Sequence, residues 1–173
     1  MLFPLSATSS YRFGDRWRIP RLGIVYPYNQ IRGVGPGGVL LRAHDGVDLQ
    51  VRVGTPVRAP FSGIVIDPRT LWKPWDPARY GNVIVIRSSE ATSRGYTALL
   101  VHLSVQSVRL GDTVRRGQVV GRTGISGNAG ETIPHLHFEL RAPFQIEFHY
   151  AGVTRFLDDF DPLPSLLAAD PKR

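Results

Sequence analysis

The stretch VGTPVRAPFSGIV, residues 53–65, is repeated in altered form as LGDTVRRGQVVG, residues 110–121. Both contain the pattern Gly-x-x-Val-Arg, followed by a second glycine and by paired β-branched residues. Short runs of this kind, bounded by glycine and proline, are typical of β-strands. The repeat predicts two hairpin units, each too small to bury a face alone, that pack together into a sandwich.

The rest of the chain continues this pattern. β-type runs such as GVDLQV, GNVIVIRS and YTALLVHLS alternate with glycine, proline and aspartate. Such spacing predicts an all-β protein, an antiparallel β-sandwich or barrel with short loops. Residues 67–80, with three prolines and two tryptophans, interrupt the pattern and are expected to form an inserted loop. Its residues Trp72 and Trp75 either contact a substrate or form a lid on their own loop. DPLPSLLAAD near the C-terminus has some helical character.

Length and composition indicate a globular protein. The 173 residues fit one domain with an arm, and 42% of them are hydrophobic. We expect an N-terminal arm at 1–30, the main domain at 31–165 and a C-terminal tail at 166–173. The sequence contains no run of 18 or more apolar residues, so no membrane span is predicted. The first ten residues do not have the pattern of a secretory signal. The chain has no cysteine, which excludes disulfides and thiolate zinc sites.

The chain is strongly basic. Its formal charge is +7 and its pI is about 10.4. This balance suggests attraction to a polyanion, either nucleic acid or an acidic polymer of the cell envelope, although a merely solvated basic surface is the alternative. The basic residues are scattered singly and no helix-turn-helix, zinc-finger or RNP-like pattern occurs, so no nucleic-acid partner is expected.

Two histidines lie one residue apart in IPHLHFEL, residues 133–140. Side chains alternate between the faces of a strand, so the leucines and the phenylalanine should face the core, while His135, His137 and Glu139 share the other face. Two histidine Cα atoms at this spacing are roughly 6.6 Å apart. That distance suits two rings that converge on a metal, although an exposed His-x-His is the alternative.

Three further residues offer metal donors or proton-transfer groups. In HDGVD, a turn at Asp-Gly would bring His44 and Asp48 together. In YTALLVHLS, alternation places His102 on one face with Leu100, opposite Leu99, Val101 and Leu103. Taken alone, a histidine in such a strand is more often structural. His149 has no companion pattern, and we expect it to be structural.

Five motifs occur in order along the chain. They are H-x-G-x-D at 44–48, G-T-P-V-x-A-P-x-x-G-x-V at 54–65, H-L-S at 102–104, G-D-x-V-x-x-G-Q-x-x-G-x-x-G at 111–124 and H-x-H-F-E at 135–139. Together they resemble the M23 family of zinc metallopeptidases, whose lysostaphin-like members cut peptide cross-links in bacterial cell walls. The resemblance implies a β fold of the duplicated-hybrid-motif kind and makes the main domain a peptidase domain.

The resemblance also implies the roles of the site residues. His44, Asp48 and His137 match the ligands of one catalytic zinc ion. His102 and His135 match the two non-ligand histidines beside the reacting water. Three protein ligands leave one coordination position open, as in catalytic zinc sites. No HExxH sequence is present, so we expect the two non-ligand histidines to share the base and oxyanion-stabilising roles.

Several expectations and alternatives follow from the resemblance. Glu139 either orients a histidine or is an ordinary surface carboxylate. The substrate would be bacterial peptidoglycan, with anionic wall polymers as possible further partners, and the protein would act as a monomer in the periplasm or outside the cell. A non-catalytic wall-binding or hydrolase-activating module is one alternative. A phosphocarrier domain of the glucose-type sugar phosphotransferase kind is another. An N-terminal segment that offers Asn29 or Asp15 to the metal would inhibit the site.

Overall fold

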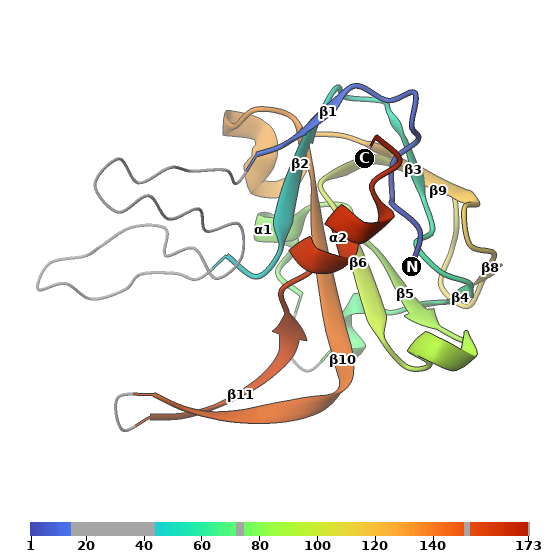
Figure 1. Cartoon of the computed structure of the whole chain (residues 1–173). Helices are drawn as coiled ribbons and strands as arrows, with labels where there is room; N and C mark the ends of the chain where they lie inside the picture. The colour runs from blue at the N-terminus through green and yellow to red at the C-terminus, as the bar shows by residue number, and fades with distance from the viewer. Residues whose placement is uncertain (15–43, 72–74, 151–152, 173) are drawn as a thin grey trace, which may run out of the picture.

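The computed structural model describes residues 1–14, 44–71, 75–150 and 153–172 (Figure 1). Trp72, Asp15 and Asn29 lie outside the described residues. The strands are β1 (Tyr11–Phe13), β2 (Val47–Val51), β3 (Pro56–Arg58), β4 (Gly63–Ile66), β5 (Ile84–Ser88), β6 (Thr97–Val101), β7 (Leu103–Gln106), β8 (Thr113–Val114), β9 (Val119–Thr123), β10 (His135–Tyr150) and β11 (Val153–Phe160). The helices are η2 (Pro68–Thr70), α1 (Pro77–Tyr80), η3 (Ala91–Ser93), η4 (Gly127–Glu131) and α2 (Leu163–Ala169).

In the described part of the chain the strands form two antiparallel sheets. The larger sheet has eight strands in the order β1-β2-β10-β6-β5-β4-β8, with β11 paired to β10. The smaller sheet has the order β3-β9-β7. The main core lies between them and includes Leu49, Val57, Leu100, Val120 and Phe138, all fully buried. The prediction of an all-β antiparallel sandwich is confirmed, and the sheets do not close into a barrel.

The two repeats pair with each other. β3 of the first repeat pairs with β9 of the second, and β4 of the first pairs with β8 of the second. Gly54 and Gly111 hold the same place before these strands and both have positive φ, 83° and 88°. The predicted hairpin units are wrong, because the two strands of each repeat lie in different sheets. The buried residues Ala59 and Phe61 carry the chain from β3 to β4 through the core.

His102 lies where the chain passes from the larger sheet to the smaller one. Its φ is +64°, a conformation that a residue within a continuous strand does not adopt. Up to Val101 the predicted alternation holds, since Leu100 joins the main core and Leu99 joins a cluster on the outer face. Beyond this point it is wrong: Leu103 packs in the main core with Leu100, because the turn at His102 reverses the faces.

The described parts of the inserted segment, residues 67–71 and 75–80, cover part of the outer face of the larger sheet. Tyr80 at the end of α1 is buried in a small cluster with Val85 and Val101, and Trp75 packs against this cluster. Asp76 caps α1 by accepting a hydrogen bond from the backbone N–H of Ala78 at 2.9 Å. The insertion therefore places a short, capped helix beside the outer face of β5 and β6.

Both ends of the chain pack on the core. Phe3 is buried, and β1 pairs with the edge of β2. The predicted helical character near the C-terminus is confirmed by α2, whose Leu166 is also buried. Tyr11 donates a hydrogen bond to Asp170 and so joins the two ends. The domain limits proposed from sequence stay predictions. No helix in the described residues is long and apolar enough to cross a membrane.

Candidate metal centre

β10 carries the two neighbouring histidines as its pattern predicts. Leu136 and Phe138 are buried in the main core, whereas His135 and His137 project from the outer face. On that face His137 lies directly opposite Asp48 of β2 in the strand register. Residues that are directly opposite in an antiparallel pair place their side chains close together. The sheet itself therefore brings one imidazole and one carboxylate into contact.

A bend before β2 brings in His44, the third donor. At Gly46 an added Cβ would lie 2.4 Å from the carbonyl oxygen of Phe138, so only glycine allows this approach to β10. The bend places His44 Nε2 at 3.2 Å from Asp48 Oδ1 and at 3.1 Å from His137 Nδ1. The predicted turn at this position is confirmed.

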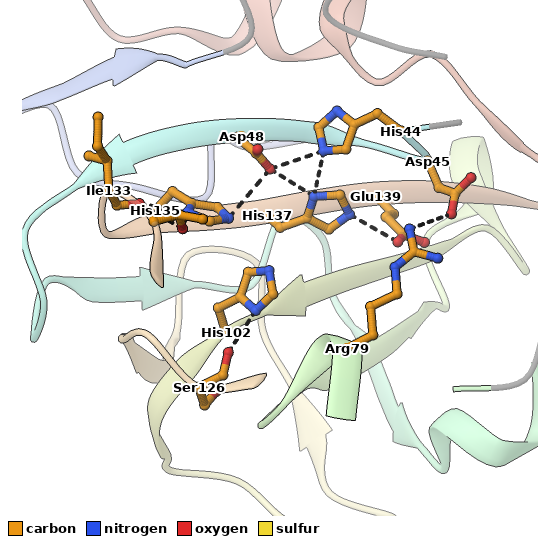
Figure 2. Close-up of polar contacts among 11 residues, drawn as sticks. His44, Asp45, Asp48, Arg79, His102, Ser126, Ile133, His135, His137 and Glu139 are labelled. Atoms are coloured by element: carbon orange, nitrogen blue, oxygen red, sulfur yellow. Dashed lines mark hydrogen bonds and ion pairs between the residues drawn. The ribbon is translucent and has the colours of Figure 1, made fainter. Parts of the chain in front are cut away.

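The three donor atoms fit a zinc ion. His137 Nδ1 and Asp48 Oδ1 are 2.8 Å apart, and the donor atoms of His44, Asp48 and His137 all lie within 4.8 Å of one another. Tetrahedral ligands at zinc–ligand distances near 2.0–2.1 Å are separated by about 3.3 Å. Nitrogen and oxygen donors in this number leave one coordination position open, as a catalytic zinc requires. Figure 2 shows the three side chains pointing toward one another.

Glu139 orients the ring of His137. The Nε2–H of His137 donates to Glu139 Oε1 at 3.0 Å, which leaves Nδ1 facing the other donors. The other carboxylate oxygen, Oε2, accepts a hydrogen bond from Arg141 Nη2 at 2.8 Å. Glu139 is 0% exposed, so the surface-carboxylate alternative is wrong. The alternation of β10 could have indicated the chain His137–Glu139–Arg141, because all three residues share one face.

Charges in this cluster stabilise one another in the metal-free protein. Burial alone would raise the pKa of Asp48, but hydrogen bonds from His137 and His44 hold it well below its usual range. Burial alone would lower the pKa of His137, but its hydrogen bonds to Asp48 and Glu139 raise it to about 9. Burial alone would raise the pKa of Glu139, but the hydrogen bonds and positive charges of His137 and Arg141 together lower it to about 2. A cation that replaces the proton on His137 Nδ1 would contact the ionised carboxylate of Asp48, while that of Glu139 lies beyond the ring at Nε2.

His102 and His135 line the same pocket as the three donors, with His135 Nε2 at 3.7 Å from Asp48 Oδ1 (Figure 2). The Nδ1 of His102 lies 2.9 Å from the carbonyl oxygen of Ser126, and the Nδ1 of His135 lies 2.8 Å from that of Ile133. A carbonyl oxygen only accepts, so each Nδ1 carries the proton and each Nε2 is left as a base. Burial, together with the nearby imidazoles of His137 and His135, lowers the pKa of His102 to about 4.

The pocket around these residues has a volume of about 50 Å³ and is also lined by Arg79, Tyr80, Asn128 and Thr132. The Nη2 of Arg79 donates to Asp45 Oδ2 at 3.0 Å, which ties α1 to the bend that carries His44. The backbone N–H of His102 donates to the carbonyl of Tyr80 at 3.2 Å. The insertion thus contacts both the metal-donor side and the proton-transfer side. Neither contact has a signal in the sequence, since the residues are far apart along the chain.

Comparison with known proteins identifies the class. Residues 42–147 match peptidase family M23, so the chain belongs to this family. It is 35% identical over 114 residues to the glycyl-glycine endopeptidase ALE-1 of Staphylococcus capitis, a match that covers 65% of this chain and 29% of that protein. It is 39% identical over 98 residues to the peptidoglycan DD-endopeptidase ShyA of Vibrio cholerae, covering 56% of this chain and 20% of that protein.

The fold is shared with solved structures. A crystal structure of a zinc-containing peptidase from Vibrio cholerae matches with a TM-score of 0.51 and 26% identity. The match covers 80% of this chain and 35% of that one. The chain spans less than a third of the length of the curated relatives that it matches. What the whole relatives act on is therefore not transferred with the fold.

Proposed function

We propose that the protein is a zinc-dependent endopeptidase that hydrolyses peptide cross-links or stem peptides of bacterial peptidoglycan. The observation that carries this proposal is the convergence of three metal donors and two histidine bases on one small pocket. Membership of family M23 and the names of the two relatives, both endopeptidases, support it. Such an enzyme acts in the periplasm or outside the cell, and we propose that it does so as a monomer.

In this proposal His44, Asp48 and His137 hold the zinc ion. When bound, zinc would act as a Lewis acid that polarises the scissile carbonyl and lowers the pKa of a water molecule toward neutrality. Glu139 keeps the Nδ1 of His137 directed at the site through its hydrogen bond to Nε2.

His102 and His135 carry out the proton transfers. In each, a backbone carbonyl accepts from Nδ1–H, so Nε2 is the nitrogen left to exchange protons in the pocket. The low pKa of His102 keeps it neutral near pH 7, as a general base must be. One imidazole accepts the proton of the attacking water and later gives it to the leaving amine. The other, in its doubly protonated form, donates a hydrogen bond from Nε2–H to the developing oxyanion.

Substitutions at the two kinds of histidine test this division. His137→Gln should lose zinc and activity together. His102→Gln and His135→Gln should keep one equivalent of zinc but lose at least 100-fold in cleavage of cross-linked peptides. Zinc content by elemental analysis separates the two groups. A zinc-loaded protein that cleaves no peptidoglycan peptide at all would favour a binding module, whereas cleavage that is unchanged by His102→Gln would refute the proton-transfer role of His102.

A further inference from the structure

A second groove, with a volume of about 260 Å³, lies beside the metal pocket. Its lining includes Arg12 of β1, Gln50 of β2, Arg52 just after β2, and Ile133. Ile133 is 60% exposed and lies two residues before His135, whose ring faces the metal pocket. The groove is therefore a continuation of the surface on which a substrate peptide would lie.

The strand register connects Arg12 directly to the site. Arg12 is paired with Gln50, and Gln50 is paired with His135 on its other side. Paired residues of neighbouring strands project from the same face of a sheet. At a spacing of about 4.8 Å per strand, the Cα atoms of Arg12 and His135 lie roughly 10 Å apart. An extended peptide bound at the metal pocket would reach this distance within three residues.

Among the described residues, no acidic side chain balances the positive charge of the groove. Arg12 and Arg52 are both exposed. No ion pair to either side chain occurs in the part of the chain that the structure describes. None of the residues that line the groove is acidic. Two arginines on one wall are suited to a carboxylate, which guanidinium groups bind through paired hydrogen bonds.

We propose that this groove binds a free carboxylate of the substrate peptide, so that the enzyme prefers anionic stem peptides to uncharged oligoglycine bridges. This inference rests on the proposed function and adds a substrate class to it. The related sequences include both a glycyl-glycine endopeptidase and a DD-endopeptidase, so family membership does not decide between the two substrates. Arg12 and Arg52 act as specificity-determining residues outside the proton-transfer machinery.

The test compares two soluble substrates that differ only in charge. The first is a cross-linked stem-peptide dimer, and the second is the same dimer with its free carboxylates converted to carboxamides. For the zinc-loaded double variant Arg12→Gln/Arg52→Gln, we expect KM for the carboxylate dimer to rise about tenfold, since an exposed charge contact is worth a few-fold. We expect kcat to change less than twofold, and cleavage of the carboxamide dimer to be unaffected.

Arg115→Gln is the matched control. Arg115 is exposed in the turn between β8 and β9, and β8 is at the edge of the larger sheet opposite to β1. An equal loss in this variant would mean that total charge, not the groove, matters. An equal loss on both dimers would also overturn the proposal. A loss seen only with intact walls that carry phosphate polymers would assign the groove to those polymers instead.

Failure of the proposed function is recognised separately. If the wild-type zinc-loaded protein cleaves neither dimer, the peptidase proposal fails, and the groove is then tested by binding of the carboxylate dimer in a calorimeter. Weaker binding to the double variant than to the wild type and to Arg115→Gln would support the groove. Equal binding to all three proteins would overturn it.

Discussion

Replacement of Glu139 by glutamine tests how the protein holds its metal donor. The carboxylate accepts from His137 Nε2 at 3.0 Å and from Arg141 Nη2 at 2.8 Å, and it is fully buried. Glutamine has the same size but carries one acceptor in place of two and no charge. One of the two donors, an imidazole or a guanidinium, must then face an NH2 group. The ring of His137 loses its fixed orientation or Arg141 loses its counter-charge.

The pKa of Glu139 and the usual cost of breaking a buried ion pair give a similar magnitude for the expected loss of stability. The pKa of Glu139 is lowered from 4.5 to about 2, chiefly by its hydrogen bond from His137 against the cost of burial. Such a shift corresponds to about 3 kcal/mol of stabilisation of the ionised form. Removal of one partner from a buried ion pair costs about 3–5 kcal/mol. We expect Glu139→Gln to lower the free energy of unfolding by about 3 kcal/mol and the zinc affinity about 10- to 100-fold.

Urea unfolding of the zinc-free protein measures the first quantity, and titration against a competing chelator measures the second. Glu90→Gln is the control, because Glu90 forms a comparable pair with Arg116 Nη2 at 2.6 Å, but the Arg116 side chain is 52% exposed. An exposed pair is worth about 1 kcal/mol or less. Similar losses in both variants, with zinc affinity unchanged in Glu139→Gln, would refute the orienting role of Glu139.

Three further predictions address the site and its surroundings. In the zinc-free protein the pKa of His137 is raised from 6.5 to about 9. Its protonated ring therefore contributes about 3 kcal/mol to the free energy of unfolding, a contribution that is complete below pH 6.5 and is lost as the pH rises through 9. A free energy of unfolding in urea that is the same at pH 9.5 as at pH 6.5 would contradict this. Gly46→Ala should lower the free energy of unfolding by about 3 kcal/mol and weaken zinc binding, because the added Cβ would lie 2.4 Å from the Phe138 carbonyl oxygen. Gly130→Ala is the control: its Cβ would have its nearest contact at 3.7 Å, so its thermal unfolding should be almost unchanged. Higher ionic strength should weaken sedimentation with cell walls more than it slows cleavage of a small soluble peptide, given the net charge of +7, and equal losses would count against charge-based targeting.

Periodicity predicted those parts of the molecule that depend on local sequence. Alternation in β10 placed Leu136 and Phe138 in the core and His135 and His137 together, as observed. The Asp-Gly turn after His44 was also readable, because it depends on neighbouring residues.

Long-range features were not predictable in this way. Each strand of one repeat pairs with a strand of the other repeat and not with its own neighbour. Such pairing depends on distant partners and is not determined by the sequence of either repeat alone. The reversal at His102 arises from one residue with positive φ, and the continuous β-type run YTALLVHLS around it does not indicate a break there. The contact of Arg79 with Asp45 joins residues 34 positions apart. The role proposed for His149 stays a prediction, because its side chain lies outside those described.

Digestion of purified peptidoglycan, followed by mass analysis of the fragments, tests whether the protein is a zinc-dependent peptidoglycan peptidase. The protein is used zinc-loaded, then with a chelator, then with zinc restored. We expect loss of cross-linked fragments with zinc, no loss with the chelator, and recovery when zinc returns, and the fragment masses name the bond that is cut. Unchanged fragments in a sample shown to hold one zinc ion per chain would refute the proposed peptidase function.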